Sequence, residues 1–426
     1  MTDLTRRTFL STAGTTVAAS ALLSTWAQRA GAAPVERVRH AVIGLGGQGH
    51  QHAREFDALD DCDVVALCDV DPERLAHAHK EIGGGSGIRL EKEFERILED
   101  ATIDSVSIVT ADHWHTPIAL HALKAGKHVY VEKPCSHNVL EGKILLEAAD
   151  RSGKCVQHGT QSRSSPGIQE AVAWLAEGHL GKVRLAKAIN HQMRGPIGHA
   201  AVEEPPAGVD YDRWLGPAPK APFTKNRWHY QWHWNWDYGC GDMGNDGIHQ
   251  VDQARWGLGV GYPKAISASG GQLFYDDDHQ TPDTQMVTFE YDDCYLVYEM
   301  RLWTSYKLEG HDNGVVFYGD KGILENGREG CFYTLTGGER TRLSGGIDLP
   351  ANVRNFIDCV KAGTPGKLHA PMKEAVASAT LCHLGNIATR VGRRLHWDAE
   401  NWTCTGDGEA NKLLTREYRK GYELPV

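Results

Sequence analysis

The chain has 426 residues, of which 23% are charged, and a formal net charge of −10 at pH 7. A chain of this length is expected to form two domains whose cores are large enough to be stable without covalent cross-links. The acidic balance argues against nucleic acid or an anionic membrane surface as a partner, and it favours a neutral or cationic small molecule.

The first 33 residues have the features of a signal for the export of folded proteins. Arg6 and Arg7 precede an uncharged stretch rich in Ala, Thr and Leu, and a small-residue cleavage pattern follows at 30–32. The apolar run is too short and too interrupted to span a membrane, and no later stretch is apolar enough. Paired arginines favour the twin-arginine route, so we expect a cleaved signal peptide at 1–33 and a periplasmic or extracellular protein. The alternatives are an uncleaved anchor and a chance Ala-rich N-terminus.

The ten cysteines show no CxxC motif and no zinc-like Cys/His cluster, so no metal site is predicted. Cys62, Cys68, Cys155 and Cys359 lie in apolar runs and are predicted to be small core residues. A chain that folds in the reducing cytoplasm does not require disulfides, although the even count leaves one or two open.

The segment 37–159 alternates between apolar runs of strand length and helical patterns. This alternation predicts a parallel, doubly wound sheet that binds ligands at the carboxyl ends of its strands. Pro72 is expected to open one of the helices. The predicted strands are 38–43, 64–68, 105–110, 128–131 and 154–158, and further predicted helices are 48–56, 116–124 and 139–151.

A glycine-rich turn follows the first predicted strand and opens the first predicted helix. Asp69 lies twenty residues after the last glycine of this turn, which is the spacing of a dinucleotide-binding fingerprint rather than of a purely structural turn. The glycines allow the backbone to approach a pyrophosphate, and the helix N-terminus supplies amides and a dipole. Asp69 would accept hydrogen bonds from the adenosine ribose and repel a 2′-phosphate, so NAD is favoured over NADP. The turn comprises Gly44, Leu45, Gly46, Gly47, Gln48 and Gly49.

Two further strand ends carry unusual residues. Asp112, Trp114 and His115 follow the third predicted strand, and the triplet Glu132-Lys133-Pro134 follows the fourth. With these motifs the sequence resembles the Gfo/Idh/MocA oxidoreductase family over essentially its whole mature length. The resemblance implies an α/β protein with an N-terminal Rossmann domain and a C-terminal α+β domain. The large, mostly antiparallel open sheet of that second domain is implied to form a homo-oligomer interface.

The resemblance also implies roles for single residues. Lys133, beside the nicotinamide, would hydrogen-bond the reacting hydroxyl and stabilise its alkoxide character as hydride leaves the carbon. Trp114 and His115 would line the nicotinamide side of the pocket, with core packing as their alternative role. Arg163 would face the substrate or act only as a hinge between the domains. The other positions implied to face the cofactor are Asp112, Glu132 and Gln161.

The second domain is expected at 160–396, followed by a tail at 397–426. Its alternating stretches predict one mostly antiparallel sheet. Two late helical segments, at 352–362 and 375–392, are expected to pack back against the first domain. The predicted strands of this domain are 183–189, 264–269, 284–291, 295–301 and 314–318.

Between 228 and 238 every even position is aromatic and every odd position is polar. In an extended conformation, one side of this segment would be a ring surface and the other a row of hydrogen-bonding groups. Such a surface suits the apolar faces and the hydroxyls of sugars, so Trp232 and Trp234 are candidate substrate-binding residues. A buried aromatic face with a solvated back is the alternative.

Many dehydrogenases of the family place an Asp and a His four residues apart on one helix face, where the His takes the hydroxyl proton. In this sequence His249 matches the histidine, but Asn245 replaces the aspartate. Because Asn carries no charge to stabilise an imidazolium, that support would have to come from Asp246 or Asp252. Asp246 and His249 are also candidate substrate-binding residues, and a structural role is the alternative for His249.

Three functions follow from these residues. The first is an oxidoreductase in which tightly held NAD takes hydride from a secondary hydroxyl of a sugar or glycoside and is recycled in place by a second carbonyl substrate. The second is a redox-neutral, NAD-dependent glycosidase, in which oxidation is followed by elimination, hydration and re-reduction. The third is a non-catalytic sugar sensor. The first has the most support from the residues.

Overall fold

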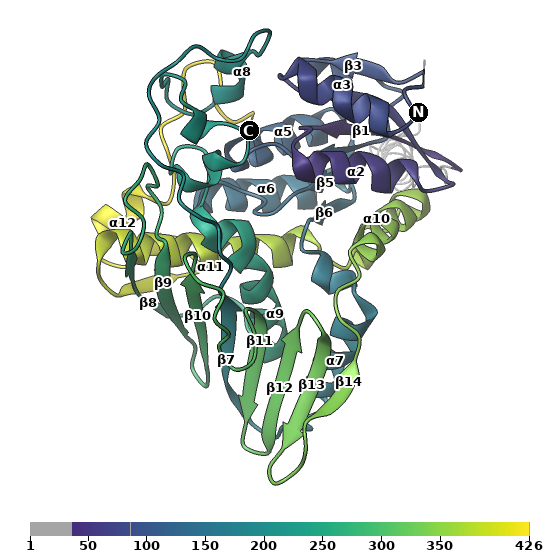
Figure 1. Ribbon diagram of the computed structural model, residues 1–426. Helices are drawn as coiled ribbons and strands as arrows, with labels where there is room; N and C mark the ends of the chain where they lie inside the picture. Colours follow the sequence, from purple (N-terminus) through teal and green to yellow (C-terminus); the bar gives the residue numbers. More distant parts are fainter. Residues whose placement is uncertain (1–35, 86, 426) are drawn as a thin grey trace, which may run out of the picture. The chain divides into compact units, whose positions relative to one another are not determined.

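The computed structural model describes residues 36–85 and 87–425 (Figure 1). The predicted signal peptide at 1–33 lies outside the described residues. All ten cysteines lie inside them, and each is free and buried, which agrees with their predicted role as small core residues. Among the described residues, no helix combines the length and the apolar character needed to cross a bilayer.

The N-terminal part is built on a parallel, doubly wound sheet, as predicted; its strand order is β3-β2-β1-β4-β5-β6, and β3 was not among the five predicted strands. Its central strands are almost completely buried, because helices cover both faces of a doubly wound sheet. The strands are β1 (Val38–Ile43), β2 (Cys62–Cys68), β3 (Arg89–Glu91), β4 (Ser105–Ile108), β5 (His128–Val131) and β6 (Val156–His158). The helices are α2 (Gly47–Asp57), α3 (Pro72–Glu81), α4 (Phe94–Leu98), α5 (Asp112–Lys124) and α6 (Val139–Ser152).

Helix α5 begins four residues earlier than the sequence suggests. Pro117 predicts a start near residue 116, because proline favours the first turn of a helix. The structure instead accepts Pro117 inside the helix and places Ala111 at the N-terminal cap. The residues 112–115 therefore form the first turn of α5 rather than a connecting loop, and this turn faces the carboxyl end of the sheet.

The C-terminal part is built on a ten-stranded sheet of order β14-β13-β12-β11-β7-β10-β9-β8-β15-β16. The described pairings are antiparallel except for β7 with β10, which agrees with the predicted mostly antiparallel sheet. The strands are β7 (Val183–Asn190), β8 (Ala265–Gly271), β9 (Thr284–Glu290), β10 (Tyr295–Arg301), β11 (Asn313–Gly319), β12 (Gly322–Gly327), β13 (Gly330–Leu335), β14 (Thr341–Ser344), β15 (Leu395–Asp398) and β16 (Thr403–Cys404).

Helices pack on one face of this sheet (Figure 1). They include α7 (Pro166–Ala176), α9 (Ile248–Leu258) and α11 (Met372–Val391). Alternate residues of β10, such as Leu296 and Tyr298, are buried under them. Because side chains alternate across a strand, neighbours such as Tyr295 point to the opposite face, where Tyr295 is 47% exposed.

The late helices pack back against the first sheet, as predicted. Helix α10 (Pro350–Ala362) contacts α2 and β1, and α11 contacts α6. The predicted tail adds β16 to the second sheet, forms α12 (Gly408–Lys412), and then returns to the first part, where the Tyr418 hydroxyl donates to Glu141 at 2.8 Å.

The aromatic segment 228–238 is not extended, and that expectation is wrong. Short helical turns take the place of a strand: η2 (Lys225–Arg227) lies just before the segment, and η3 (Gln231–Trp234) lies within it. Backbone hydrogen bonds such as Gln231 N to Trp228 O at 3.1 Å close these turns. Turns do not send alternate side chains to opposite sides, so the even-numbered rings do not form one surface. Trp234 is 1% exposed, whereas Tyr230 is 47% exposed.

The remaining short elements are α8 (Tyr211–Leu215), the 3-10 turns η1 (Gln161–Ser164) and η5 (Pro365–Lys367), and the π turn η4 (Met243–Gly247), which leads directly into α9.

Candidate functional site

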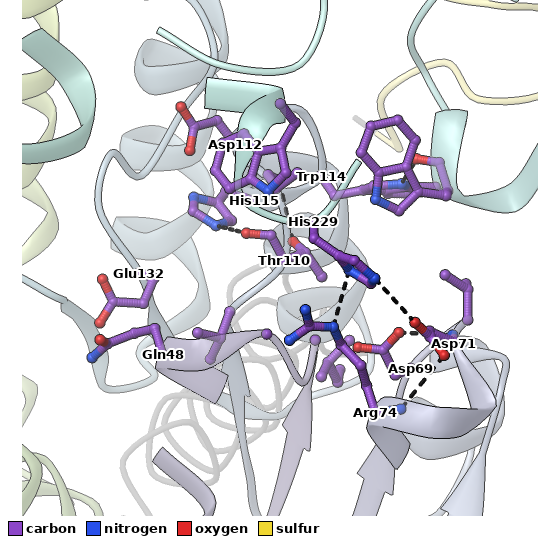
Figure 2. A pocket seen from close by; sticks show the side chains of 18 of the residues that line it. Gln48, Asp69, Asp71, Arg74, Thr110, Asp112, Trp114, His115, Glu132 and His229 are labelled. Carbon is purple, nitrogen blue, oxygen red and sulfur yellow. Dashed lines mark hydrogen bonds and ion pairs between the residues drawn. The ribbon is translucent and has the colours of Figure 1, made fainter. Parts of the chain in front are cut away.

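A cavity of about 390 Å³ opens at the carboxyl ends of β1, β2, β4 and β5. One wall is the glycine-rich turn, and the opposite wall comes from the segment 213–233, which belongs to the second part of the chain. Figure 2 shows side chains from both walls converging on this space. The cavity therefore lies where a doubly wound sheet binds ligands.

The glycines of the turn serve different purposes. Gly44 has a φ of +90°, and a Cβ there would lie 2.6 Å from the Val109 carbonyl carbon. A Cβ on Gly49 would lie 2.0 Å from the carbonyl oxygen of Gly44. Both glycines allow close packing of the backbone. Gly46 and Gly47, in contrast, line the cavity and have no atom within 4 Å of an added Cβ. This free space lies at the N-terminus of α2, where backbone amides can bind a pyrophosphate.

The two kinds of glycine predict opposite results on substitution. Gly46→Val should weaken dinucleotide binding more than tenfold, because its side chain fills the space for the pyrophosphate, while stability changes by less than about 1 kcal/mol. Gly49→Ala should lower stability, because its Cβ collides with backbone. Isothermal titration with NAD and urea unfolding of the NAD-free protein measure the two effects. Equal losses of stability in both variants would contradict this assignment.

Asp69 lies directly after β2 and points into the cavity (Figure 2). Its carboxylate accepts hydrogen bonds from the backbone amides of Leu45, at 2.5 Å, and Asp71, at 2.8 Å. Burial raises the pKa of Asp69 to about 6 even though these amides lower it. This partly buried carboxylate is thus short of donors, and the hydroxyls of a ribose would supply them.

The segment 206–236, named here the covering segment, crosses the cavity beside Asp69. Because Asp69 would bind the adenosine ribose, this end is called the adenosine end. Figure 2 shows His229 of this segment pointing at Arg74 and Asp71. Arg74 Nε donates to His229 Nδ1 at 3.0 Å, and His229 Nε2 lies 3.6 Å from Asp71. Nearby, Lys92 Nζ donates to the Gly208 carbonyl at 3.2 Å. These contacts fasten the covering segment to the elements that surround Asp69.

The first turn of α5 lines the inner part of the cavity. His115 bridges two strand ends, since its ring nitrogens lie 2.7 Å from Pro134 O and 2.9 Å from Thr110 O. The Trp114 indole donates to Trp214 O at 3.0 Å. Asp112 is 1% exposed, its Oδ2 has no hydrogen-bond partner among the described residues, and burial raises its pKa to about 7. Asp112 therefore presents to this wall of the cavity a buried carboxyl oxygen that has no partner in the described part of the chain.

Glu132 is buried beside Lys133 at the inner end of the cavity, which is called here the reactive end. Its carboxylate contacts His52 Nε2 at 3.0 Å and accepts from the Lys133 amide at 2.9 Å and from Gln161 Nε2 at 3.3 Å. Burial raises the pKa of Glu132, but the His52 hydrogen bond and the charges of His52 and Lys133 more than offset this and bring it to about 2. Glu132 is thus a fixed negative charge next to Lys133.

Lys133 and Asn245 meet across the cavity, although 112 positions separate them in the chain. Lys133 Nζ donates to Asn245 Oδ1 at 3.1 Å. The Asn245 amide nitrogen donates to Asp242 Oδ1 at 2.8 Å and to the Tyr230 hydroxyl at 3.2 Å. Because a carboxylate can only accept, Asp242 fixes the amide with its oxygen toward Lys133. Asn245 therefore positions the ammonium through its carbonyl oxygen.

His249 lies at the start of α9, half-buried and not among the residues that line the cavity. Burial and the charge of Lys133 lower the pKa of His249, whereas Asp246 raises it. Asp246 accepts from Asn313 Nδ2 at 2.6 Å and from Gln192. His249 is therefore close enough to Lys133 to feel its charge, and Asp246 is the carboxylate that supports it most.

Besides His249, several predicted site residues do not line the cavity: Leu45, Gly49, Gln161, Arg163, Trp234 and Asp246. Arg163 forms a bidentate ion pair with Asp252, at 2.8 and 2.9 Å, and is 5% exposed. Arg163 is therefore a buried structural group, and Asp252 is held by this ion pair, although its charge still raises the pKa of His249. Trp234 is core packing, with its indole donating to Gln231 at 3.0 Å. Gln161 lies behind Glu132, whereas Trp232 does line the cavity, stacked on His233.

The sequence analysis missed several residues of the cavity. Tyr230 and His233 lie at its reactive end, and Arg74 and His229 lie at its adenosine end. Tyr230 belongs to the aromatic segment 228–238. Its hydroxyl, which the tryptophans lack, is the feature that could have identified it as a polar site residue. Burial and the nearby charge of Lys133 hold the pKa of His233 well below its usual range, so this ring is neutral.

Comparison with known families identifies both parts of the chain. Residues 38–160 match a family model described as "Oxidoreductase family, NAD-binding Rossmann fold". Residues 194–424 match one described as "Oxidoreductase family, C-terminal alpha/beta domain". The first part is therefore an NAD-binding Rossmann domain, which agrees with the open space beside Gly46 and the partly buried acid at Asp69.

Curated relatives are similar to parts of the chain. The scyllo-inositol 2-dehydrogenase (NAD(+)) of Bacillus subtilis is 30% identical over 164 residues, covering 38% of this chain and 46% of that protein. The myo-inositol 2-dehydrogenase of Thermotoga maritima is 25% identical over 159 residues, covering 37% and 47%. A glycosyl hydrolase family 109 protein of Shewanella pealeana is 30% identical over 126 residues, 28% of each chain. The chain thus covers less than half the length of these relatives.

Solved structures resemble most of the described fold. The aldose-aldose oxidoreductase from Caulobacter crescentus superposes with a TM-score of 0.66 at 20% identity, over 84% of this chain and 99% of that one. A levoglucosan dehydrogenase in complex with NADH gives a TM-score of 0.66 at 16% identity, over 84% and 99%. At such low identity these similarities establish the fold.

Proposed function

Because the chain belongs to the Gfo/Idh/MocA oxidoreductase family, we propose that it is an NAD-dependent oxidoreductase that acts on a secondary hydroxyl of a sugar or glycoside. The observation that carries the proposal is the meeting of Lys133 and Asn245 at the inner end of the dinucleotide cavity. The inositol dehydrogenases and the sugar-acting structural relatives support a polyhydroxylated substrate.

Lys133 would hydrogen-bond the hydroxyl that reacts. An ammonium fixed by Asn245 and balanced by buried Glu132 stabilises negative charge as it develops on that oxygen. The cofactor, when bound, accepts the hydride from the carbon that bears this hydroxyl. The chain itself fits this group, since the space at Gly46 and Gly47 suits a pyrophosphate and the donor-poor carboxylate of Asp69 suits a ribose.

The proton of the substrate hydroxyl needs an acceptor. His249 is kept neutral by burial and by Lys133, so it is free to accept a proton, and Asp246 would stabilise the imidazolium that results. The Tyr230 hydroxyl accepts a hydrogen bond from the Asn245 amide at 3.2 Å. We propose that His249 accepts this proton. Tyr230 would instead help to orient the substrate through its hydrogen bond with Asn245.

Tyr230→Phe tests this division of roles. Removing the hydroxyl takes away one acceptor of the Asn245 amide but leaves Asp242 to hold it, so we expect kcat to fall about tenfold and the pH profile to keep its shape. Steady-state kinetics between pH 5 and 9 would measure both. Tyr211→Phe, outside the cavity lining, is the matched control. If the variant instead changed how kcat falls on the acidic side of the pH profile, Tyr230 would be the proton acceptor.

The covering segment supports retention of the cofactor between turnovers. Its contacts from His229 to Arg74 and from Gly208 to Lys92 close over the adenosine end, so release of the dinucleotide would require them to break. We therefore propose that the cofactor stays bound and is recycled by a second carbonyl substrate. Purified protein should release NAD on heating, and oxidation of a sugar should proceed without added NAD when an artificial electron acceptor is present.

An NAD-dependent glycosidase is the second candidate, favoured by the similarity to glycosyl hydrolase family 109 proteins. Its overall reaction is hydrolysis, in which water replaces the aglycone and no net oxidation occurs. Aryl glycosides supplied without an electron acceptor separate the two functions. Release of aglycone at a steady rate supports the glycosidase, and formation of keto-sugar only with an acceptor supports the oxidoreductase. Protein that binds sugar and does neither would be a sensor.

Export and assembly belong to the same proposal. The twin arginines at Arg6 and Arg7 support export by the twin-arginine route, and free cysteines throughout the described residues are compatible with folding before export. The sheet face that carries exposed Tyr295 and Met286 supports a homo-oligomer. Fractionation of producing cells and sedimentation of the purified protein test these two points.

A further inference from the structure

We propose that His50, His77 and Glu81 form a binding site for a divalent transition metal, with zinc as the expected ion, between α2 and α3. Each side chain offers one ligand atom, and these atoms all lie within 4.8 Å of one another. None of the three residues lines the dinucleotide cavity. The proposal therefore concerns a second site, and it stands whether or not the proposed activity is correct.

The spacing of the ligand atoms is close to that of a metal site. His50 Nδ1 lies 2.7 Å from one oxygen of Glu81, and His77 Nε2 lies 3.6 Å from the other. The two imidazole rings lie with their centroids 4.6 Å apart. Ligands of tetrahedral zinc, with bonds of about 2.0–2.1 Å, are about 3.3 Å from one another, so small side-chain rotations would bring all three onto one ion.

The chemistry of the ligands selects the ion. Two imidazole nitrogens and one carboxylate oxygen suit zinc and its neighbours in the first transition row better than calcium or magnesium, which prefer oxygen alone. Three protein ligands leave a fourth position for water. The His77 side chain is 64% exposed, whereas that of His50 is 9% exposed. An ion would therefore enter from the solvent side, at His77, and bind His50 as its buried ligand.

Arg54 is the side-chain cation that would compete with a metal ion for Glu81, and it is weakly held. Arg54 Nη1 lies 3.6 Å from Glu81, and the Arg54 side chain is 56% exposed. An exposed ion pair of this kind contributes little stability, so the arginine can turn away into solvent when a metal binds. Glu81 would then neutralise one of the two charges of the ion.

A metal here would join two helices that shape the cofactor cavity from outside. Helix α2 begins at Gly47 in the glycine-rich turn, and α3 begins at Pro72, three residues after Asp69. A ligand that binds the folded chain and not the unfolded one raises its stability. Zinc is therefore expected to raise the thermal stability of the NAD-free protein.

The test is a zinc titration of the full chain after treatment with a chelator, followed by isothermal calorimetry and by thermal unfolding. Because the chain has 22 histidines, the control must be another histidine. His79→Ala removes an imidazole from the same helix outside the cluster. We expect one zinc per chain, binding at least tenfold weaker in His77→Ala and Glu81→Gln, and unchanged within twofold in His79→Ala.

The unfolding temperature should rise with zinc in the wild type and in His79→Ala but not in His77→Ala. His77 is exposed, so its removal is not expected to prevent folding, and circular dichroism verifies this. Zinc binding to His77→Ala within threefold of the wild type, or no saturable binding to the wild type, would overturn the proposal. The cluster would then be a hydrogen-bonded ion pair alone.

Discussion

Replacement of Lys133 by Met should lower turnover about 10²- to 10³-fold, the range found when one donor to a developing oxyanion is removed. Met has nearly the length of Lys and carries no charge, so the variant should fold and keep its dinucleotide. Asn245 would lose the donor to its carbonyl oxygen, while Asp242 still holds its amide. Rates of keto-sugar formation, divided by the NAD released on heating, give turnover per loaded site.

Lys92→Met is the matched control, because Lys92 lines the same cavity at its other end. Lys92 donates to the Gly208 carbonyl, so its loss should speed NAD release and leave the chemical step unchanged. Turnover of Lys133→Met within fivefold of the wild type would remove Lys133 from the reaction. A variant that has lost its NAD would indicate instead that Lys133 mainly binds the cofactor.

Strands β5 and β10 were predictable because their patterns are strong, whereas β3 and β12 to β16 were not predicted. The predicted range 128–131 coincides with β5 and 295–301 coincides with β10. The first is a short apolar run buried between helices, and the second alternates between a buried and an open face. The glycine-rich turn with its following acid was equally predictable, since its spacing reflects the geometry of one βαβ unit.

The aromatic segment shows where pattern alone misleads. An alternation of aromatic and polar residues is typical of a strand, but no neighbouring strand pairs with 228–238, and local backbone bonds close it into turns. Which rings reach the cavity then depends on the turns. Trp232 reaches it, Trp234 packs into the core, and Tyr230 becomes part of the reactive end.

Long-range partners explain the other differences. The ion pair of Arg163 with Asp252 joins residues 89 positions apart, and the contact of Lys133 with Asn245 joins residues 112 apart. Such pairings depend on how two domains pack, which single-sequence patterns do not encode. The replacement of the expected aspartate by Asn245 was visible in the sequence, but its use as a support for Lys133 required the position of Asp242.

Binding of ADP-ribose should become about tenfold weaker between pH 8 and pH 5, with Asp69 as the cause. Burial raises the pKa of Asp69 to about 6 in the free protein, so its carboxyl is ionised at pH 8 and mostly protonated at pH 5. Hydrogen bonds from ribose hydroxyls favour the charged form and should lower this pKa on binding. Affinity is therefore lost as the pH falls through the pKa of the free site, by about a factor of ten for each unit below it.

Asp69→Asn keeps the shape of the side chain and removes its charge. Calorimetry should find weaker binding at pH 8, about tenfold or more because charge-assisted hydrogen bonds are lost, and little change down to pH 5. The same variant should bind 2′-phospho-ADP-ribose better relative to ADP-ribose, because the repulsion of a 2′-phosphate is gone.

ADP-ribose is the right probe because a second acid, Asp112, is buried at the other end of the cavity. Burial raises the pKa of Asp112 to about 7, and this group would add its own pH dependence to the binding of whole NAD, which extends to that end. With ADP-ribose, Asp112→Asn should keep the pH dependence of the wild type, and only Asp69→Asn should lose it. If both variants kept it, a group other than Asp69 would bind the ribose, and the preference for NAD would require a different explanation.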